Sequence, residues 1–384
     1  MPIPQTRGAS THVFELARAL RRLGDEVHVV CRREASQKSE ETISGVHFHR
    51  VYRGMMGPVS RSGPRAGIDS ESQGLGAISY YLYLRSAYAL FAGLVASRLA
   101  KDHDLQVILE RESAFGAGAI ASIISHKPMI LEMIGPRYSR LSATVCSKVL
   151  AYNEKMIPDG AMGKTVFVKA AVNPDLFKPD QKARESIRAR LGLDGSIVVG
   201  YVGTFQSWHG LDDLIEAARI LLRSNHRFKF LFVGPIPANI KSSIDSELAE
   251  SLIFAGTVPY ESVPDYVNAS DIAVAPYNIQ NSSRRDKGIG SPLKVLEYMA
   301  CGKPVVGSSL PQVAEIVVDG ETGFLFPQGE PKLLAARITE LANNPELRDE
   351  MGRAGLEKVR LYSWLSFASR LQVLLEDCVN SQRS

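Results

Sequence analysis

The sequence predicts an α/β protein made of two doubly wound, Rossmann-like domains, each with a mainly parallel sheet. Short β-branched apolar runs alternate with amphipathic helical stretches in both halves of the chain, the pattern of a parallel sheet covered by helices. The 384 residues exceed the roughly 250–300 that one hydrophobic core supports. Hydrophobic residues make up 45% and charged residues 22%, as is typical of a globular protein.

The first half contains fewer clear elements than the second. We expect a helix at His12–Leu23, where Val13, Leu16, Ala17 and Leu20 share one face and Gly24 follows. The expected strands are Glu26–Cys31, Gln106–Leu109, Pro128–Met133 and Thr165–Val168.

The second half repeats the alternation more regularly. The expected strands are Ser196–Val202, Lys229–Val233, Leu252–Ala255, Ile272–Ala275 and Pro304–Gly307. The expected helices are Leu211–Ser224, Glu261–Asn268, Pro292–Ala300 and Pro331–Asn343.

These elements set the expected domain limits. We place an amino-terminal domain at 1–175, a carboxyl-terminal domain at 176–360, and a closing helix at 361–384 that packs back toward the first domain. The join lies near Asn173–Leu191, where NPDLFKPDQ is typical of an extended linker. A doubly wound domain normally has a strand before its first helix. Here the chain starts with a Pro-rich loop, so we expect either that the true start lies further upstream or that the first domain lacks its amino-terminal strand and exposes apolar sheet edges.

Charge and cysteine content argue against several classes of protein. The net charge of +4, from 45 basic and 41 acidic residues, is too small to imply a nucleic-acid partner. The four cysteines form no CxxC and no Cys/His cluster, so neither a disulfide framework nor a zinc site is predicted. The start, MPIPQTRGAS, has no apolar leader. We expect a cytoplasmic protein.

Two segments raise the question of a membrane contact. Ile78–Ala100 is the most apolar stretch, but Arg85 and Arg98 interrupt it, so a buried helix is favoured over a face resting on the membrane surface. Thr42–Gly67 carries four arginines and no acid, and its later part is predicted to be a mobile loop. That loop either contacts anionic lipid head groups or a phosphorylated acceptor, or is simply solvated.

The segment Gly288–Val306, GIGSPLKVLEYMACGKPVV, carries the strongest chemical signal. Ser291 is a good N-cap and Pro292 suits the first helical position, so a helix is predicted to start here and to end at Cys301–Gly302. Gly288 and Gly290 let a ligand approach the backbone closely. Exposed amides at a helix start, together with the helix dipole, bind diphosphates.

Lys294 and Glu297 are three residues apart and therefore share a face of this helix. A lysine one turn into the helix can reach a phosphate, and a carboxylate two turns in can accept both hydroxyls of a ribose. The spacing alone fits equally an ordinary capped helix with a surface Lys–Glu pair.

A family resemblance decides between these interpretations. SPLKVLEYMACGKPVVGS is similar to the signature of the family 4 glycosyltransferases, retaining enzymes of the GT-B architecture, in the subset with SPxKxxE and WHG motifs. Further blocks resemble the family in the same order, over nearly the whole chain. They are RGASTHVFELARALRRLGDEVHVV, VNPDLFKP, GYVGTFQSWHGLDDLIEA, FAGTVPYESVPDYVNASDIAVAPY, DGETGFLF and YSWLSFASRL.

The resemblance implies a role for each matching residue. Glu297 would hold the donor ribose, and Lys294 would hold the diphosphate together with the backbone of Ser291, Pro292 and Leu293. The remaining implied positions are Gly256 and Val258 at the base, Gly203 and His209 near the phosphates, Gly8 and Ala9 on a loop closing over the donor, and Arg111 and Glu132 at strand ends on the acceptor side.

The implied activity is the transfer of a sugar, most simply a hexose, from a nucleotide-sugar to a glycan or lipid-linked acceptor. No DxD motif flanked by apolar residues is present, so a metal-independent reaction is expected, with the nucleotide-sugar as co-substrate and no cofactor. No carboxylate nucleophile is evident in the motifs, which points to attack on the face that the diphosphate leaves.

Two departures from the family pattern keep alternatives open. Ile289 stands where the family has the first of two glutamates, and Ile134 stands where the family often has a polar residue near the sugar. With the absent first strand, they are compatible with an inactive homologue that binds nucleotide-sugars or glycans. A nucleotide-sugar epimerase is the third interpretation.

Overall fold

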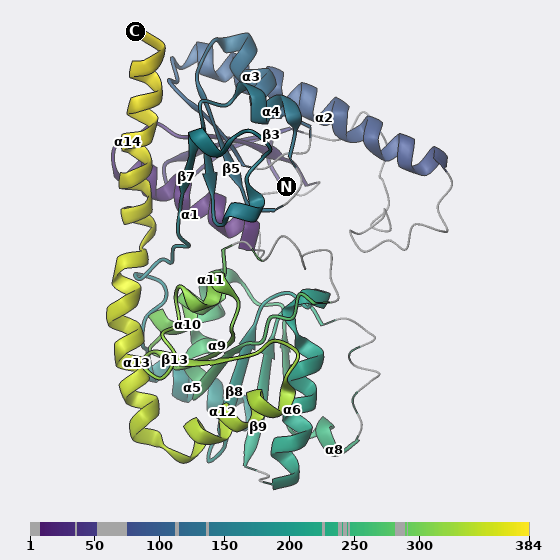
Figure 1. Ribbon diagram of the computed structural model, residues 1–384, viewed down its shortest axis with the longest axis vertical. Helices are drawn as coiled ribbons and strands as arrows, with labels where there is room; N and C mark the ends of the chain where they lie inside the picture. Colours follow the sequence, from purple (N-terminus) through teal and green to yellow (C-terminus); the bar gives the residue numbers. More distant parts are fainter. Residues whose placement is uncertain are drawn as a thin grey trace. The chain divides into compact units, whose positions relative to one another are not determined.

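The computed structural model divides the chain into two compact units, each described by itself (Figure 1). Unit 1 contains Ser10–Val168 and Ala368–Ser384, and unit 2 contains Lys169–Phe367. The domain limits expected at 175 and 360 remain predictions. The structure describes residues 8–383 except 35–36, 52–74, 112–114, 136–137, 225–226, 237–239, 241–243, 245, 281–288 and 290.

Unit 1 contains two separate sheets. In the first, β1 (His28–Arg32) pairs in parallel with β3 (Val46–Val51), which pairs antiparallel with β2 (Glu40–Ile43). The second is fully parallel in the order β4-β5-β6-β7. Among the described residues no strand precedes α1 (Gly8–Arg22) and no ladder joins the two sheets. The second sheet consists of β4 (Ile108–Arg111), β5 (Met129–Met133), β6 (Lys148–Ala151) and β7 (Thr165–Phe167).

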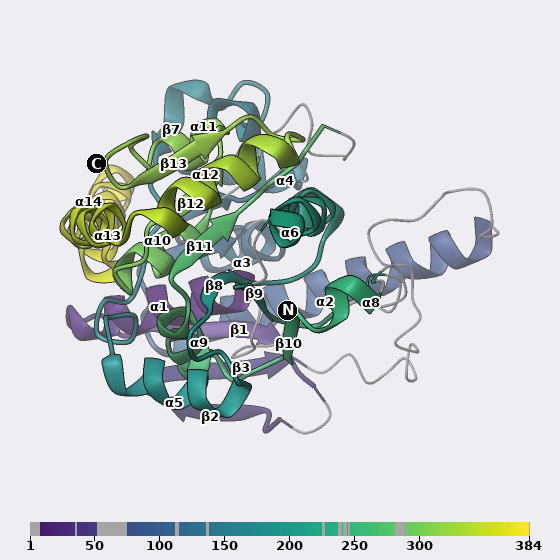
Figure 2. The ribbon, with the colours of Figure 1, turned by 90° about the horizontal axis from the view of Figure 1, so that it is seen from below.

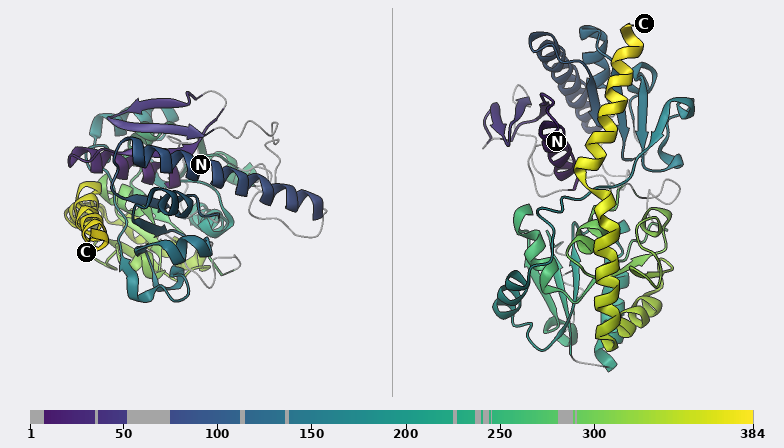
Figure 3. Two further views of the ribbon diagram at one scale, coloured as in Figure 1. Left: turned by 90° about the horizontal axis from the view of Figure 1, so that it is seen from above. Right: turned by 90° about the vertical axis from the view of Figure 1, so that its left-hand side faces the viewer.

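The helices of unit 1 pack closely where small residues allow it. A Cβ on Gly93 of α2 would lie 2.8 Å from the side chain of Ile120 in α3, so these two helices are in tight contact. Helix α2 extends beyond its contact with α3 and beyond the strands of both sheets (Figure 3). The helices are α2 (Leu75–Asp102), α3 (Ala117–Ser125), α4 (Arg140–Val145), η1 (Glu154–Met156), η2 (Met162–Lys164) and most of α14 (Trp364–Arg383).

Helix α2 is buried on one side only. Ala89, Ala92 and Ala100 are buried, whereas Leu90 and Phe91 are 52% and 56% exposed. The prediction of a largely buried helix is therefore wrong for the part whose side chains are described, because a single face meets α3 and β1. Among all the residues that the structure describes, no helix has both the length and the apolar character needed to cross a membrane.

Unit 2 is one six-stranded parallel sheet in the order β10-β9-β8-β11-β12-β13. Its strands are β8 (Ile197–Val202), β9 (Phe228–Val233), β10 (Leu252–Gly256), β11 (Ile272–Ala275), β12 (Val305–Ser308) and β13 (Gly323–Phe326). Its helices are α5 (Gln181–Leu191), α6 (Leu211–Ser224), α8 (Ser246–Ala249), α9 (Val263–Ala269), α10 (Leu293–Ala300), α11 (Pro311–Ala314), α12 (Pro331–Asn343) and α13 (Pro345–Val359), with 3₁₀ turns η3 (Ser207–His209), η4 (Tyr260–Ser262) and η5 (Arg360–Tyr362).

Side chains of the unit 2 strands alternate between two apolar cores. Tyr201 and Phe230 pack with α6 and α12 on one face, and Ala273 packs with α9 and α10 on the other. This is the two-residue period of a strand buried on both sides. Figure 2 shows the sheet edge-on between α6 and α12 on one side and α5 and α9 on the other. The doubly wound α/β prediction is confirmed for this unit.

Several predicted boundaries were wrong. Helix α1 begins at Gly8, four residues before the predicted His12, so Gly8 lies in a helix and not in a loop. Part of the expected linker forms α5, which the Asp180 side chain caps by accepting from the Ala183 amide at 2.9 Å. The arginine-rich stretch includes β3, where Arg50 is buried, and its later part lies outside the described residues.

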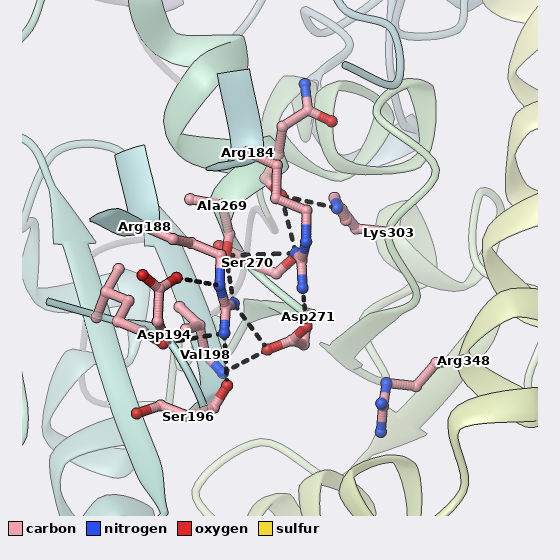
Figure 4. Close-up of polar contacts among 12 residues, drawn as sticks. Arg184, Arg188, Asp194, Ser196, Val198, Ala269, Ser270, Asp271, Lys303 and Arg348 are labelled. Carbon is pink, nitrogen blue, oxygen red and sulfur yellow. Dashed lines mark hydrogen bonds and ion pairs between the residues drawn. The ribbon is translucent and has the colours of Figure 1, made fainter. Parts of the chain in front are cut away.

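A buried ionic network holds α5 against the unit 2 sheet (Figure 4). The Asp271 carboxylate, just before β11, accepts from Arg184 Nη2 at 2.5 Å, from Arg188 Nη1 at 3.2 Å and from the Val198 amide at 2.7 Å. Burial alone would raise the pKa of Asp271, but the Arg184 charge and the Val198 amide outweigh it and lower the pKa. Remaining arginine hydrogens donate to carbonyls, among them that of Ala269.

Asp271→Ala is expected to lower the free energy of unfolding of unit 2 by about 3–5 kcal/mol, because two cations would remain buried without their counterion. The difference from wild type is full at neutral pH and shrinks as the pH falls below 3.8, because the folded pKa is lower than that ordinary value. Urea denaturation at several pH values measures both effects.

Asp194→Ala is the matched control. Its carboxylate lies 3.9 Å from Arg188 Nε and is 73% exposed, so the expected loss is below about 1 kcal/mol. Equal losses in the two variants, or no loss in Asp271→Ala, would contradict the role of the network.

Candidate active site

The strand order of unit 2 places a switch point between β8 and β11. From β8 the chain moves outward through β9 and β10, and then returns to β11 on the other side of β8. Ligands of open parallel sheets bind outside the carboxyl ends of the strands at such a point, because the connecting segments diverge there. Gly203 directly follows β8, and Pro276 follows β11.

Helix α10 is fixed to this edge of the sheet by a buried tyrosine. Tyr298 Oη accepts from the Val202 amide at 2.7 Å and donates to the Val202 carbonyl at 3.3 Å. Its side chain is 1% exposed. Because Val202 is the last residue of β8, the two bonds hold α10 through its second turn beside the switch point.

The start of α10 differs by one residue from the prediction. Pro292 is the N-cap and Leu293 the first helical residue, and no side chain caps the helix, so Ser291 is not the N-cap. The Ser291 hydroxyl oxygen is buried and has no hydrogen-bond partner within the described part of the chain. The predicted end is confirmed, since Gly302 follows the last turn with a φ of 68°. Gly288 and Gly290 lie outside the described residues.

Two glycines that follow neighbouring strands allow other groups to lie close to the backbone. Gly203 has a φ of 145°, and a Cβ there would lie 2.8 Å from Lys294 Nζ. Gly234, after β9, has a φ of 142°, and its Cβ would lie 2.0 Å from the Gly203 carbonyl oxygen. Side chains rarely adopt these conformations, so only glycine fits at both positions.

Lys294 points back from α10 toward β8. Its Nζ donates to Tyr201 Oη at 3.1 Å and lies 4.2 Å from the centre of the Tyr201 ring and 5.2 Å from that of Tyr277. Burial lowers the pKa of Lys294 to about 7, against the opposing effect of the Glu297 carboxylate. The amine is held mainly by aromatic faces, which stabilise a cation less than a paired carboxylate does.

His209 belongs to the same cluster. Its Nδ1 lies within hydrogen-bond distance of the Thr204 carbonyl and 3.2 Å from Tyr201 Oη, which itself donates to Thr204 O at 2.8 Å. Gly210 completes the WHG motif, and a Cβ there would meet the Pro276 carbonyl oxygen at 1.5 Å. The glycine therefore lets this turn lie directly against the segment after β11.

The remaining predicted donor residues lie along the same edge. Glu297 is half-buried one turn after Lys294, and its Oε1 is 3.5 Å from Tyr260 Oη. Gly256 ends β10 with a φ of 74°, and a Cβ there would meet nothing within 4 Å. Val258 packs against the core beneath α5. Ile289 is 4% exposed and belongs to the apolar core around α10.

The predicted acceptor residues lie in unit 1, on adjacent strands. Arg111 and Glu132 are direct partners in the β4–β5 register, and their Nε and Oε2 atoms are 3.9 Å apart. The Glu132 side chain is 1% exposed, and its Oε1 lies 2.7 Å from His12 Nε2 and accepts from Tyr152 Oη at 2.8 Å. Burial would raise the pKa of Glu132, but His12 and Arg111 outweigh it and lower the pKa to about 2.

The sequence did not single out His12, Tyr152, Tyr201 or Tyr277. His12 lies in the first described turns of α1, where Gly8 and Ala9 also lie. In the sequence it is marked only as the start of an amphipathic helix. In the sequence, Tyr201 and Tyr277 look like ordinary apolar residues of a strand and of a loop. Their proximity to Lys294 follows from the sheet order, which spacing along the chain does not reveal.

Comparison with known proteins bears on the fold and the class of enzyme. Residues 183–358 match the model of the glycosyl transferases group 1, and residues 6–132 match that of Glycosyltransferase Family 4. An uncharacterized glycosyltransferase of Methanocaldococcus jannaschii is 25% identical over 301 residues, which cover 73% of this chain and 77% of that protein.

A second relative is a GDP-mannose-dependent phosphatidylinositol monomannoside mannosyltransferase of Mycolicibacterium smegmatis. It is 28% identical over 53% of this chain, and the match spans 54% of that protein, about half its length. The fold of Anabaena HepE, solved with UDP and glucose, matches with a TM-score of 0.72 at 16% identity, over 97% of each chain. The two domain models indicate an enzyme of the family 4 type, and the chain is thus a glycosyltransferase with the GT-B fold.

Proposed function

We propose that the chain is a retaining, metal-independent transferase that moves a hexose from a nucleotide-sugar to a glycan or lipid-linked acceptor. The observation that carries the donor half of the proposal is the Lys294 amine, held at the switch point against Tyr201 and Tyr277. A cationic group with a lowered pKa gains most from an anionic ligand, because the ligand supplies the charge that burial withholds.

The diphosphate would lie at the first turn of α10. Three kinds of donor converge there: the amides at the helix start, the Lys294 ammonium, and the buried Ser291 hydroxyl that has no partner among the described residues. Gly203 leaves the backbone of the β8 loop open to the same group. The departing diphosphate is the product that gains charge, so these donors act where charge develops.

The nucleoside would extend from the diphosphate along α10 toward β10. Glu297 is one turn further along the helix and would accept from both ribose hydroxyls. Gly256 has open space in the direction of a side chain, which leaves room for a base. Solved structures of Anabaena HepE contain UDP or UDP-glucose, which supports a uridine donor as the first to try.

The chemical step would be a front-face substitution. The bond between the anomeric carbon and the diphosphate oxygen breaks, and the acceptor oxygen bonds to that carbon on the same face. The acceptor proton passes to the departing diphosphate, so no protein base is required. The protein contributes by stabilising the leaving group and orienting the acceptor.

On the acceptor side, Arg111 and the Glu132–His12–Tyr152 cluster of unit 1 would position the attacking hydroxyl. Glu132 remains a carboxylate at neutral pH and is fixed by two partners, so it would act by orienting His12. A lipid-linked acceptor would bring unit 1 to a membrane surface. The exposed apolar side of α2, with Phe91 and Leu94 next to Arg98 and Lys101, suits anionic head groups.

Glu297→Gln is expected to reduce donor-dependent transfer about tenfold or more, because the amide keeps only one, uncharged acceptor oxygen, whereas a hydrogen bond to a charged group contributes about 1.5–3 kcal/mol. Nucleoside diphosphate release with a panel of glycan acceptors measures the rate, and circular dichroism checks the fold. Glu261→Gln, on exposed η4, is the control and should keep wild-type activity. Full activity in Glu297→Gln would rule out the ribose role. Tight donor binding without turnover in wild type would favour the inactive homologue.

The Lys294 amine is expected to titrate near pH 7 in the ligand-free protein and at a higher pH once UDP or GDP binds, because the diphosphate stabilises the ammonium. The chemical shift of its ε-carbon, assigned with Lys294→Arg, gives both titrations. A pKa close to 10.5 with and without nucleotide would show that the amine is neither desolvated nor in contact with the ligand.

Phe91→Ser with Leu94→Ser is expected to weaken binding to phosphatidylglycerol vesicles about tenfold or more, since burying a large apolar side chain contributes about 1.5–3 kcal/mol. Co-sedimentation with vesicles measures the bound fraction. Leu361→Ser, at a 72% exposed leucine of unit 2, serves as the control. Unchanged binding in the double variant would remove α2 from the proposal.

A further inference from the structure

Four of the eight histidines gather on one face of the small sheet of unit 1, outside the residues assigned to the transferase. His28 of β1 and His47 of β3 are direct partners in the parallel register, and His49 is two residues further along β3 on the same face. Glu26 precedes His28 by two residues, and His103 directly follows α2.

The side chains of these five residues are in contact with one another. His28 Nε2 lies 2.9 Å from Glu26 Oε1, and His28 Nδ1 lies 3.0 Å from His49 Nε2. His103 Nδ1 lies 3.4 Å from the same Glu26 oxygen. The His28 ring has its centre 4.8 Å from that of His47, 5.1 Å from that of His49 and 4.3 Å from that of His103.

The surroundings of His28 and His49 favour the neutral imidazole at these two residues. Burial lowers the pKa of His28, and the neighbouring His103 and His47 lower it further against the opposing Glu26. Burial and His28 also lower the pKa of His49. Neutral imidazole is the form that binds transition metals.

We propose that Glu26, His28 and His47, completed by His49 or His103, form a binding site for a divalent transition metal ion. One ligand atom from each of the first three lies within 4.8 Å of the others. Ligands about 2.0–2.1 Å from a central ion are up to about 4 Å apart, so small side-chain rotations bring them to bonding distance. The imidazole donors favour zinc, nickel or copper over magnesium or calcium, which prefer oxygen ligands alone.

The ion would link three segments that the chain joins only through long connections. Glu26 and His28 lie at the start of β1, His47 lies on β3, and His103 follows the last residue of α2. The sheet that carries His28 and His47 has three strands, which is near the smallest size that is stable on its own. Its role would be structural, because no proposed donor or acceptor residue is among the ligands.

Isothermal titration with Zn²⁺ tests the site, using the full chain without an affinity tag and stripped of metal with a chelator. We expect one ion per chain and a higher thermal unfolding midpoint with Zn²⁺ than without it. His28→Gln and His47→Gln should each weaken Zn²⁺ binding at least about tenfold and reduce the shift of the midpoint.

Two further variants keep the result interpretable. Glu26→Gln changes a side chain that is 54% exposed, so this protein should fold and should bind Zn²⁺ more weakly than wild type. His126→Asn changes an exposed histidine elsewhere in unit 1, at a φ of 57° that asparagine tolerates, and should bind as wild type does. Absence of stoichiometric binding, or equal affinity in wild type and the ligand variants, would overturn the proposal.

Discussion

The attachment of α10 to the carboxyl end of β8 is the constraint on which the donor half depends. Tyr298 satisfies both the amide and the carbonyl of Val202, so neither the helix nor the strand end can shift without leaving buried polar groups unpaired. This fixes the distance from Lys294 to Gly203 and to the Tyr201 ring. Because Lys294 is held so close, the residue after β8 has to be a glycine, Gly203.

The sequence predicted unit 2 well because its elements are regular. Strand Ile272–Ala275 and the helices Leu211–Ser224 and Pro331–Asn343 have the predicted bounds, since buried runs and helical periodicity are strong local signals. The sequence also placed Lys294 and Glu297 one turn apart on one helix. It could not reveal the aromatic surroundings of Lys294, because Tyr201 lies on β8 and Tyr277 in the segment after β11, and these two strands are neighbours only in the folded sheet.

Unit 1 was less predictable for a related reason. Helix α1 begins at Gly8 although glycine and a short polar run usually mark a loop, and tertiary packing of Leu16 and Leu20 overrides that preference. The clustering of His28, His47 and His103 arises from strand register and from the end of a distant helix. No short spacing in the sequence encodes it, so a search for compact metal motifs passes over these residues.

The lowered pKa of Lys294 has a consequence for chemical labelling. An amine with a pKa of about 7 is partly deprotonated at neutral pH and is therefore a nucleophile, whereas ordinary lysines remain protonated there. An aldehyde that carries a phosphate would be drawn to the start of α10 and would form an imine with this one side chain. Reduction of the imine would then leave a permanent mark on the donor site, and a nucleotide-sugar that occupies the site would protect against it.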